Sequence, residues 1–300
     1  MNIKPTRLRK GDKIAVIAPA GPVTPDEIQP AMDLLVQEGY RVIKAPHLFE
    51  KQGYLAGMDT VRLEDLHSVF NNDGIKAVLC ARGGYGTLRF LDKIDYGRIK
   101  RNPKIILGYS DITALLLAVH KMTGLVTFHG PVVRDLSGKG EKGLRVFLDI
   151  VSSQRRPTFN LSVGTVLREG KARGLLMGGN LSLLSHLIGT PFVPSMKGVI
   201  LFLEEKGEPL YRIDRMLTHL RLGGVLKELS GVILGDFVGC GDMEDINALL
   251  MDITAGIDIP VISGLAVGHG HKNMTLPVGL RAELDTGNRN LTFLEACVIP

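Results

Sequence analysis

The sequence predicts an α/β protein, in which a parallel sheet with helices on both faces is followed by a smaller α/β or α+β domain. Three observations lead to this fold class. Short apolar runs alternate with amphipathic helical patterns through the first half of the chain. Glycine is frequent, at 36 of 300 residues, as expected for many tight turns between strands and helices. Hydrophobic residues make up 45% of the chain, which is enough to bury a sizeable core.

The first domain is predicted over residues 1–135. Its first strand is the apolar run at 13–18, and the helical pattern at 25–38 is stopped by Gly39. The later elements are a strand at 41–45, a helix at 60–71, a strand at 76–81, a short helix at 86–91, a strand at 104–107, a helix at 111–122 and a strand at 126–128. Ligands bind beyond the carboxyl ends of the strands in such sheets. The glycine-bearing loops at those ends are 18–22, 81–86 and 107–111.

A polar, basic and glycine-rich segment at 136–165 predicts a linker that contains a short helix. The second domain, over 166–300, is less regular. Its predicted elements are strand segments within 167–180 that meet a glycine turn, a helix at 180–188, a strand at 199–203, a helix at 211–222, a strand at 231–234, a helix at 243–255 and a hairpin over 280–295 that turns at DTGN.

Composition and charge exclude several classes of protein. The net charge is +5, but no dense basic stripe with stacking aromatics is present, so no nucleic-acid partner is expected. No apolar run approaches the roughly 20 residues of a membrane helix, and the run at 14–18 is too short for a signal peptide. Three separated cysteines without a CxxC pattern predict neither a zinc knuckle nor a redox pair, and they fit a cytoplasmic location.

Ser110 lies in the segment LGYSD, between a buried strand and a helical pattern. One interpretation is that its hydroxyl caps the helix, with Asp111 favourable in the first turn. The other is that a sharp turn presents the hydroxyl as a nucleophile, while amides at the start of the helix face an oxyanion. The α/β-hydrolase pattern GxSxG is not matched, because Asp111 and Ile112 follow the serine. Local sequence leaves both interpretations open.

Three further segments carry groups that suit a reactive serine. Gly83 and Gly84 in ARGGYG free backbone amides that could donate to an oxyanion. The alternatives are a plain turn and a phosphate cradle, although neither glycine fingerprint of a phosphate loop is present. Glu204 directly follows the apolar run at 199–203, where a carboxylate can orient a histidine. His269 and His271 lie in a glycine-rich loop, which can aim an imidazole across a cleft. No carboxylate–histidine set accompanies this pair, so a metal site is not favoured. The remaining alternative is that one or both histidines are surface residues.

Taken together, these segments resemble the LD-carboxypeptidase family of serine peptidases, which also contains the microcin-C self-immunity peptidases. The matching stretches run in family order over nearly the whole chain. They are GDKIAVIAPAGP, ARGGYGTLRFLDKIDY, ILGYSDITALLLAV, TFHGP, LMGGNLSLL, LFLEEKGEPLYRIDRMLTHL, GVILGDF and GHGHKNMTLPVG. Each motif is modest, but the ordered set is highly specific.

The resemblance implies a flavodoxin-like first domain, a smaller second domain and a Ser–His–Glu triad between them. Ser110 matches the family nucleophile in GYSD, and Glu204 matches the acidic residue at the end of LFLE. Only His269 fits the pattern GHxxxNxTLP. The backbone amides of Gly84 and Asp111 would form the oxyanion hole. The implied substrate is a cytoplasmic murein tetrapeptide, which loses its terminal D-alanine without a metal or organic cofactor, and the implied assembly is a homodimer.

The carboxylate of the leaving residue needs a cation, for which Arg82 and Arg212 are the candidates, with surface charge as the alternative for both. Three other functions compete with a murein peptidase. A microcin-type peptidase would act on aminoacyl-nucleotide-like peptides, but members of that type often stack the base on Trp, which this chain lacks. A non-catalytic ligand-binding protein would not need the complete Ser/His/Glu set. A nucleotide-binding oxidoreductase would carry a glycine fingerprint that is missing.

Overall fold

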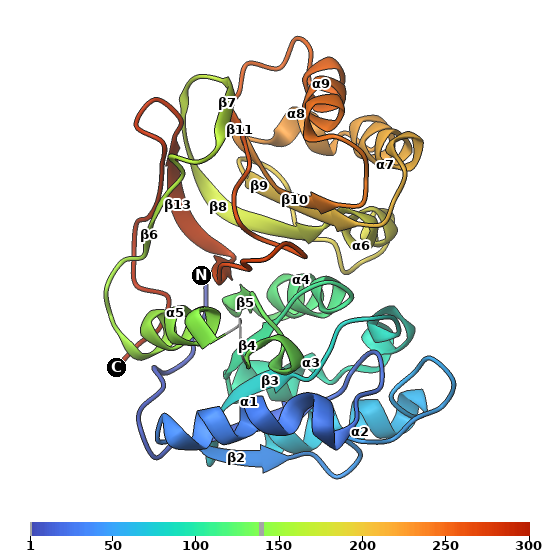
Figure 1. The fold of residues 1–300 in the computed structure, drawn as a ribbon, viewed down its shortest axis with the longest axis vertical. Coiled ribbons are helices and arrows are strands. Elements are labelled where there is room, and N and C mark those ends of the chain that lie inside the picture. Colours follow the sequence, from blue (N-terminus) through green and yellow to red (C-terminus); the bar gives the residue numbers. More distant parts are fainter. Residues whose placement is uncertain (1, 138–140) are drawn as a thin grey trace.

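The N-terminal lobe of the computed structural model, which describes residues 2–137 and 141–300, is built on a sheet with the strand order β12-β5-β4-β3-β1-β2 (Figure 1). Strands β1 to β5 are parallel. Their bounds are Lys13–Ile17, Arg41–Lys44, Ile75–Cys80, Ile105–Gly108 and Thr127–His129. The order β2-β1-β3-β4-β5 is that of flavodoxin-like sheets. The fold class predicted for this part of the chain is therefore confirmed.

Two groups of helices pack on this sheet. Helix α1 lies against η2, whereas α2, η1, α3 and α4 pack together. The bounds are α1 Pro25–Gln37, α2 Asp59–Asn71, η1 Thr87–Lys93, α3 Tyr96–Arg101, α4 Ile112–Thr123 and η2 Val133–Asp135. Local sequence sets several of these limits. Glu27 accepts a hydrogen bond from the Thr24 amide at 2.9 Å at the start of α1, and Gly124 ends α4 in a left-handed conformation.

The C-terminal lobe is built on a second sheet, with the strand order β6-β14-β13-β8-β9-β10-β11-β7. Strands β8 to β11 are parallel, and the remaining strands run antiparallel to their neighbours. The strands are β6 Thr158–Asn160, β7 Thr165–Arg168, β8 Lys171–Asn180, β9 Ile200–Lys206, β10 Gly231–Val238, β11 Val261–Ser263, β13 Leu280–Asp285 and β14 Asn290–Phe293. The helices of this lobe are α6 Leu181–Leu187, α7 Leu210–Leu222, α8 Val225–Glu228 and α9 Met243–Ile253. Helix α5, Glu141–Ser152, lies beside the N-terminal lobe, where the Val151 carbonyl accepts the Leu8 amide (Figure 1).

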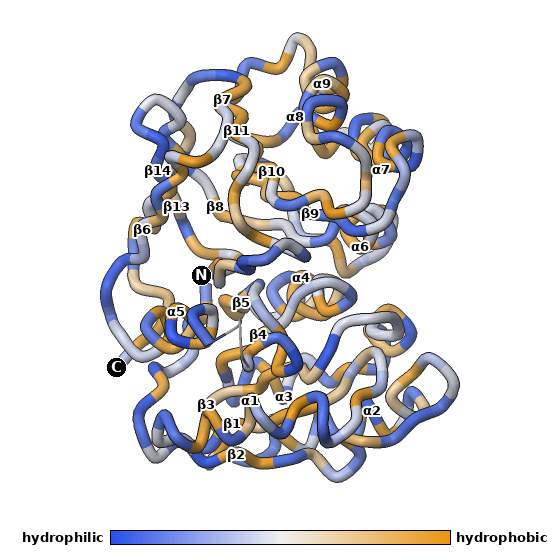
Figure 2. Tube along the Cα trace, in the orientation of Figure 1, coloured by the Kyte–Doolittle hydropathy of each residue, from blue (hydrophilic) through white to orange (hydrophobic). Residues whose placement is uncertain are grey.

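Helix α4 lies between the two lobes (Figure 1). It contacts β4 and β5 of the first sheet as well as β8 and α6 of the second lobe. Its residues from Ile112 to His120 are all buried, and its trace is hydrophobic over most of its length (Figure 2). A helix that is apolar on every side needs partners on every side. The sequence ITALLLAVH thus places the helix that follows Ser110 inside the molecule.

The second half of the chain also contributes to the first sheet. Strand β12, Leu276–Val278, pairs antiparallel with β5 and places Leu276 opposite His129. It begins seven positions after His269 in the sequence. The domain limits at 135 and 165 remain a prediction, but the strand pairing shows that segment 276–278 belongs to the first sheet.

Most of the predicted elements are present, including the hairpin formed by β13 and β14. Within 167–180 the strand segments are the end of β7 and β8, with Gly170 between them, and Gly178 and Gly179 lie near the end of β8 with positive φ. Phe202 of the neighbouring strand leaves no room for a side chain at Gly178. The sequence did not predict α3, α8, β6, β11 or β12, which are all short.

Residues 138–140 of the predicted linker lie outside the described residues. No helix within the described ranges combines the length and apolar character needed to cross a bilayer.

Candidate active site

Ser110 stands at the turn between β4 and α4 in a strained backbone conformation. Its φ is +61°, a region that costs a residue with a side chain about 1–3 kcal/mol. The residue at the N-cap position of α4 is Asp111, not Ser110. The carbonyl of Ser110 accepts the Thr113 amide at 2.9 Å, but among the described residues its hydroxyl caps no amide. The structure therefore does not support the interpretation of Ser110 as a helix cap.

The loop that carries the sequence ARGGYG lies directly against this serine. A methyl group at Gly83 would stand 2.7 Å from Cβ of Ser110, so only glycine allows this approach. Gly84 follows with a φ of +115°. Within residues 2–137 and 141–300, the amides of Gly84 and Asp111 donate to no other group. Two unpaired donors close to a serine suit an oxyanion that forms during acyl transfer.

Two buried charged residues hold the ARGGYG loop in place. Asp111 joins its end to the Ser110 turn, and Arg62 joins it to the loop that follows β1. The carboxylate of Asp111 accepts the Thr87 amide at 2.9 Å, and the Thr87 hydroxyl donates to the Asp111 carbonyl at 2.7 Å. Burial raises the pKa of Asp111 above its ordinary value. Arg62 donates to the Gly86 carbonyl at 3.0 Å and to the Pro19 carbonyl at 2.5 Å. The sequence analysis did not identify Arg62 as part of the site, because a buried arginine cannot be told from a surface one in a helical pattern.

Glu204 and His269 form the second half of the site. Glu204 lies at the carboxyl end of β9 and is fully buried. Its Oε2 is 2.7 Å from Nδ1 of His269. Burial raises the pKa of Glu204, and the hydrogen bond from His269 opposes this shift. A carboxylate bound at Nδ1 orients the imidazole, leaves Nε2 for proton transfer and stabilises the imidazolium.

The loop that carries His269 is shaped by three neighbours. A methyl group at Gly268 would lie 2.6 Å from Oε2 of Glu204, and the φ of this residue is +116°. The Gly268 amide donates to Oδ1 of Asn273 at 3.0 Å, which closes the loop. On the other side, the Gly270 amide donates to Asp236 at 3.2 Å. Asn273 belongs to the motif that selected His269, whereas the part played by Asp236 is visible only in the fold.

The two halves of the site meet through Tyr109 and Thr113, the residues that flank the Ser110 turn. The ring of Tyr109 packs on the imidazole of His269, with 4.8 Å between the ring centroids. Thr113 Oγ1 accepts the Asn180 amide at 3.1 Å, which joins α4 to the end of β8. No hydrogen bond links Ser110 to His269 in the described part of the chain. Catalytic hydrogen bonds often tighten only when the substrate is bound.

Arg82 and Arg212 lie in different surroundings. Arg82 is half-buried in the ARGGYG loop, and its guanidinium donates to the Pro22 carbonyl at 3.1 Å. Arg212 is exposed on α7 and pairs with Glu208 at 3.1 Å. Its charge is therefore already partly balanced, whereas Arg82 has no carboxylate partner among the described residues.

His271 is exposed, and no group of three or more His, Cys, Asp or Glu within the described residues is placed to hold a metal ion.

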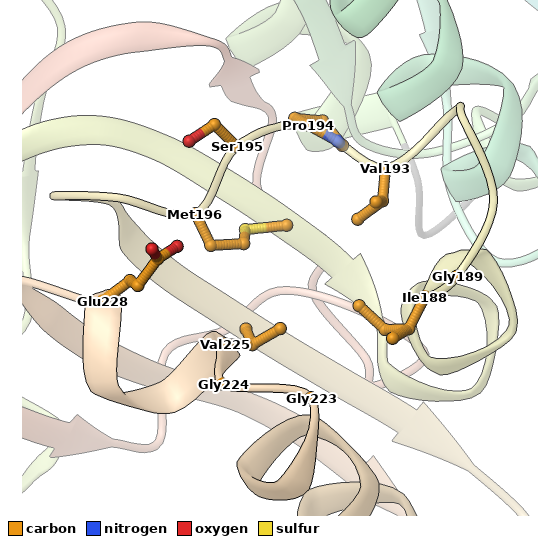
Figure 3. A pocket seen from close by; sticks show the side chains of 10 residues that line it. All are labelled: Ile188, Gly189, Val193, Pro194, Ser195, Met196, Gly223, Gly224, Val225 and Glu228. Atoms are coloured by element: carbon orange, nitrogen blue, oxygen red, sulfur yellow. The ribbon is translucent and has the colours of Figure 1, made fainter.

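A separate hollow of about 310 Å³ lies in the C-terminal lobe, lined by Ile188, Met196 and Val225 among others (Figure 3). It is formed by the end of α6, the loop that follows it and the junction of α7 with α8. None of its lining residues is Ser110, Glu204 or His269. This hollow is therefore distinct from the candidate active site.

Comparison with known proteins finds a matching family model for each half of the chain. Residues 14–130 match the model of the LD-carboxypeptidase N-terminal domain, and residues 173–284 match that of the LD-carboxypeptidase C-terminal domain. The chain belongs to the LD-carboxypeptidase family. It is a serine-type LD-carboxypeptidase by this membership. The two family domains coincide with the parts of the chain that supply Ser110 and the Glu204–His269 pair.

Individual members of the LD-carboxypeptidase family match over nearly their whole length. A probable murein peptide carboxypeptidase of Bacillus subtilis is 40% identical, over 96% of this chain and 93% of its own. A crystal structure of muramoyltetrapeptide carboxypeptidase from Oxalobacter formigenes is 32% identical, with a TM-score of 0.81 over 94% of this chain and 97% of that one. An MccF-like protein from Bacillus anthracis is 31% identical, with a TM-score of 0.90 over 98% and 99%.

Proposed function

We propose that Ser110, His269 and Glu204 act as the catalytic triad that releases the terminal D-alanine from murein tetrapeptides. The observation that carries the proposal is the buried Glu204–His269 pair, whose imidazole packs on the residue next to Ser110. A carboxylate, an imidazole and a strained serine at one junction form the arrangement that acyl transfer requires. The family to which the chain belongs, and the names of the relatives described above, support the substrate.

In the proposed reaction, Oγ of Ser110 attacks the carbonyl of the bond between the L-centre of the diamino acid and D-alanine. Nε2 of His269 takes the hydroxyl proton and passes it to the amine of the leaving D-alanine. The amides of Gly84 and Asp111 donate to the oxyanion of the tetrahedral intermediate. Water, deprotonated by His269, then hydrolyses the acyl-enzyme and restores the serine.

The substrate ends in a carboxylate that needs a positive partner. Arg82 is the better of the two candidates, because it belongs to the loop that contacts Ser110 and is not paired with an acid. A cytoplasmic location, where peptides released from the wall are recycled, fits the three buried free thiols. We also propose that the protein is a homodimer. Size-exclusion chromatography with light scattering, which measures the molar mass in solution, tests this.

Incubation with murein tetrapeptide, followed by mass spectrometry for D-alanine, tests the proposed reaction. The unaltered protein should release D-alanine, and Ser110→Ala should lower kcat/KM by at least about 10³-fold. His269→Ala should have a similar effect, whereas His271→Ala, two positions along the same loop, serves as the matched control with near-normal activity. Absence of release from folded protein would remove the substrate, and full activity of Ser110→Ala would remove the triad.

A microcin-type peptidase is the second candidate, favoured by the similarity to the MccF-like protein. Such an activity would act on aminoacyl-nucleotide-like peptides. The two functions share the triad and differ in the group bound beside it. An aminoacyl sulfamoyl nucleoside, assayed next to the tetrapeptide, separates them through the ratio of the two kcat/KM values.

A further inference from the structure

Two exposed tyrosines lie next to the loop that borders Ser110. Tyr85 directly follows Gly84 and is 46% exposed, and Tyr54 is 67% exposed. Their rings form an edge-to-face pair with 5.7 Å between the centroids. Single exposed apolar residues are common, but two large aromatic rings in contact at the border of a catalytic site form a surface that a ligand can cover.

The backbone that carries the tyrosine pair is held from several sides. The Tyr54 loop is closed by two hydrogen bonds between Gln52 and Leu55, of 2.8 and 3.0 Å. The Ala56 amide donates to the Ala20 carbonyl at 2.9 Å, which fixes this loop to the first βα turn. On the other side, Arg62 holds the Gly86 carbonyl. A prearranged aromatic surface loses little freedom when a ligand covers it, so the contact area contributes to affinity.

The charge around the pair is balanced. Arg89 lies near both phenol groups, and its guanidinium is paired with Asp59 at 2.8 Å. The exposed side chain of Met58 adds apolar surface in the same loop region. The surface thus offers flat aromatic faces rather than a free charge, which favours a neutral ring over an anionic group.

The position of the pair relative to Ser110 limits which part of a substrate reaches it. Gly83 contacts Ser110, and Tyr85 follows two positions later, within about 7 Å of backbone. The second ring extends the surface by a further 5.7 Å. A carboxypeptidase releases a single residue, which spans about 3.5 Å. A surface of two rings is longer than this leaving group, so the released residue alone would not cover it.

We propose that Tyr54 and Tyr85 form a subsite for the amino-sugar ring of murein peptides that still carry their glycan. This inference rests on the proposed function. The stem peptide of murein has no aromatic or apolar ring, whereas the sugar to which it is attached presents a face of C–H groups that packs on tyrosine. A nucleobase would use the same stacking chemistry, and the experiment separates the two sources.

The test compares kcat/KM for three substrates: free tetrapeptide, tetrapeptide linked to a murein disaccharide, and an aminoacyl sulfamoyl adenosine. For the unaltered enzyme, the disaccharide-linked peptide should be preferred over the free peptide. In Tyr54→Ala and Tyr85→Ala this preference should fall about tenfold, the effect of losing one stacked ring. Tyr54→Phe and Tyr85→Phe keep the ring and should keep the preference. Leu222→Ala, which removes an exposed apolar side chain at the end of α7, should leave all three values unchanged.

An equal loss for free and disaccharide-linked peptide would overturn the subsite, because the tyrosines would then only support the loop. A loss confined to the adenosine substrate would assign the pair to a nucleobase and also overturn it. Calorimetry with the disaccharide alone measures binding to the tyrosine pair without any cleavage, so it tests the subsite independently of the proposed reaction. If the enzyme cleaves none of the substrates but binds the disaccharide in a tyrosine-dependent way, the proposed function fails and the subsite stands. Absence of disaccharide binding removes the subsite.

Discussion

At the scale of single residues, the site depends on positions where no side chain fits. Gly268 lets the backbone of the His269 loop pass close to the side chain of Glu204. Gly83 lets the backbone of the ARGGYG loop pass equally close to Ser110. The contact between Nδ1 of His269 and Oε2 of Glu204 therefore depends on the close approach of Gly268 to the glutamate side chain. The orientation of the imidazole is therefore sensitive to a single added methyl group.

Gly268→Ala should lower kcat/KM by about 100-fold, because the new methyl group would lie 2.6 Å from Glu204 Oε2 and displace the carboxylate from His269. Gly189→Ala is the matched control, since Gly189 also has positive φ but an added methyl group there meets no atom within 4 Å. The control should lose about 1–2 kcal/mol of stability and keep its activity. Steady-state kinetics and urea unfolding of both variants measure this difference, and equal activities would contradict the role of Gly268.

At the scale of elements, α4 joins the two halves of the site. Thr113 Oγ1 accepts the Asn180 amide, and a methyl group at Gly179 would lie 2.6 Å from the same oxygen. Helix α4 therefore rests on the end of the strand next to Glu204, with which Asn180 is paired in register. The position of Ser110 relative to His269 follows from this contact.

Thr113→Val should reduce kcat more than it raises KM, because it leaves the buried Asn180 amide without an acceptor and loosens α4 against β8. The cost in stability should be about 1–3 kcal/mol. Thr127→Val is a suitable comparison, since Thr127 is equally buried and its hydroxyl donates to the Leu116 carbonyl within the first lobe. If the two variants reduce kcat to the same extent, the contact between α4 and β8 has no special effect on catalysis.

The sequence predicted the strands and helices that surround the site better than the contacts across it. Ser110 and Glu204 follow apolar strands, a local pattern, whereas His269 was chosen over His271 only through the pattern GHxxxNxTLP of the family that the chain resembles. Tyr109 and Asp236 were not predicted as neighbours of His269, because these contacts join segments more than 30 residues apart. Strand β12 was missed because three residues carry too little periodicity to distinguish a strand from a loop.

At the scale of the whole molecule, a buried histidine lies between the lobes. His129 is fully buried in β5, with Tyr109 on one side and Phe202 of the second lobe on the other. Neither ring nitrogen has a hydrogen-bond partner among the described residues. Burial, with a smaller contribution from the nearby His269, lowers the pKa of His129 to about 3. The protein therefore holds this imidazole neutral.

Acid should destabilise the protein through His129. The unfolded chain binds a proton at this histidine below pH 6.5, whereas the folded protein does not bind it until pH about 3. Stability is therefore lost as the pH falls through this range, by about 2 kcal/mol between pH 6.5 and 5. His129→Leu should remove this part of the loss, whereas His186→Leu, at an exposed position on α6, should keep it. Urea unfolding at both pH values gives the comparison, and an unchanged pH dependence in His129→Leu would contradict it.

The pairing of β12 with β5 has a consequence for how substrates enter. The chain that leaves His269 becomes an edge strand of the sheet whose β4 leads to Ser110. A large opening of the two lobes would break the hydrogen bonds that pair β12 with β5. Access by a peptide must instead come from smaller adjustments of the surrounding loops, because the pairing of β12 with β5 ties the His269 loop to the sheet that carries Ser110.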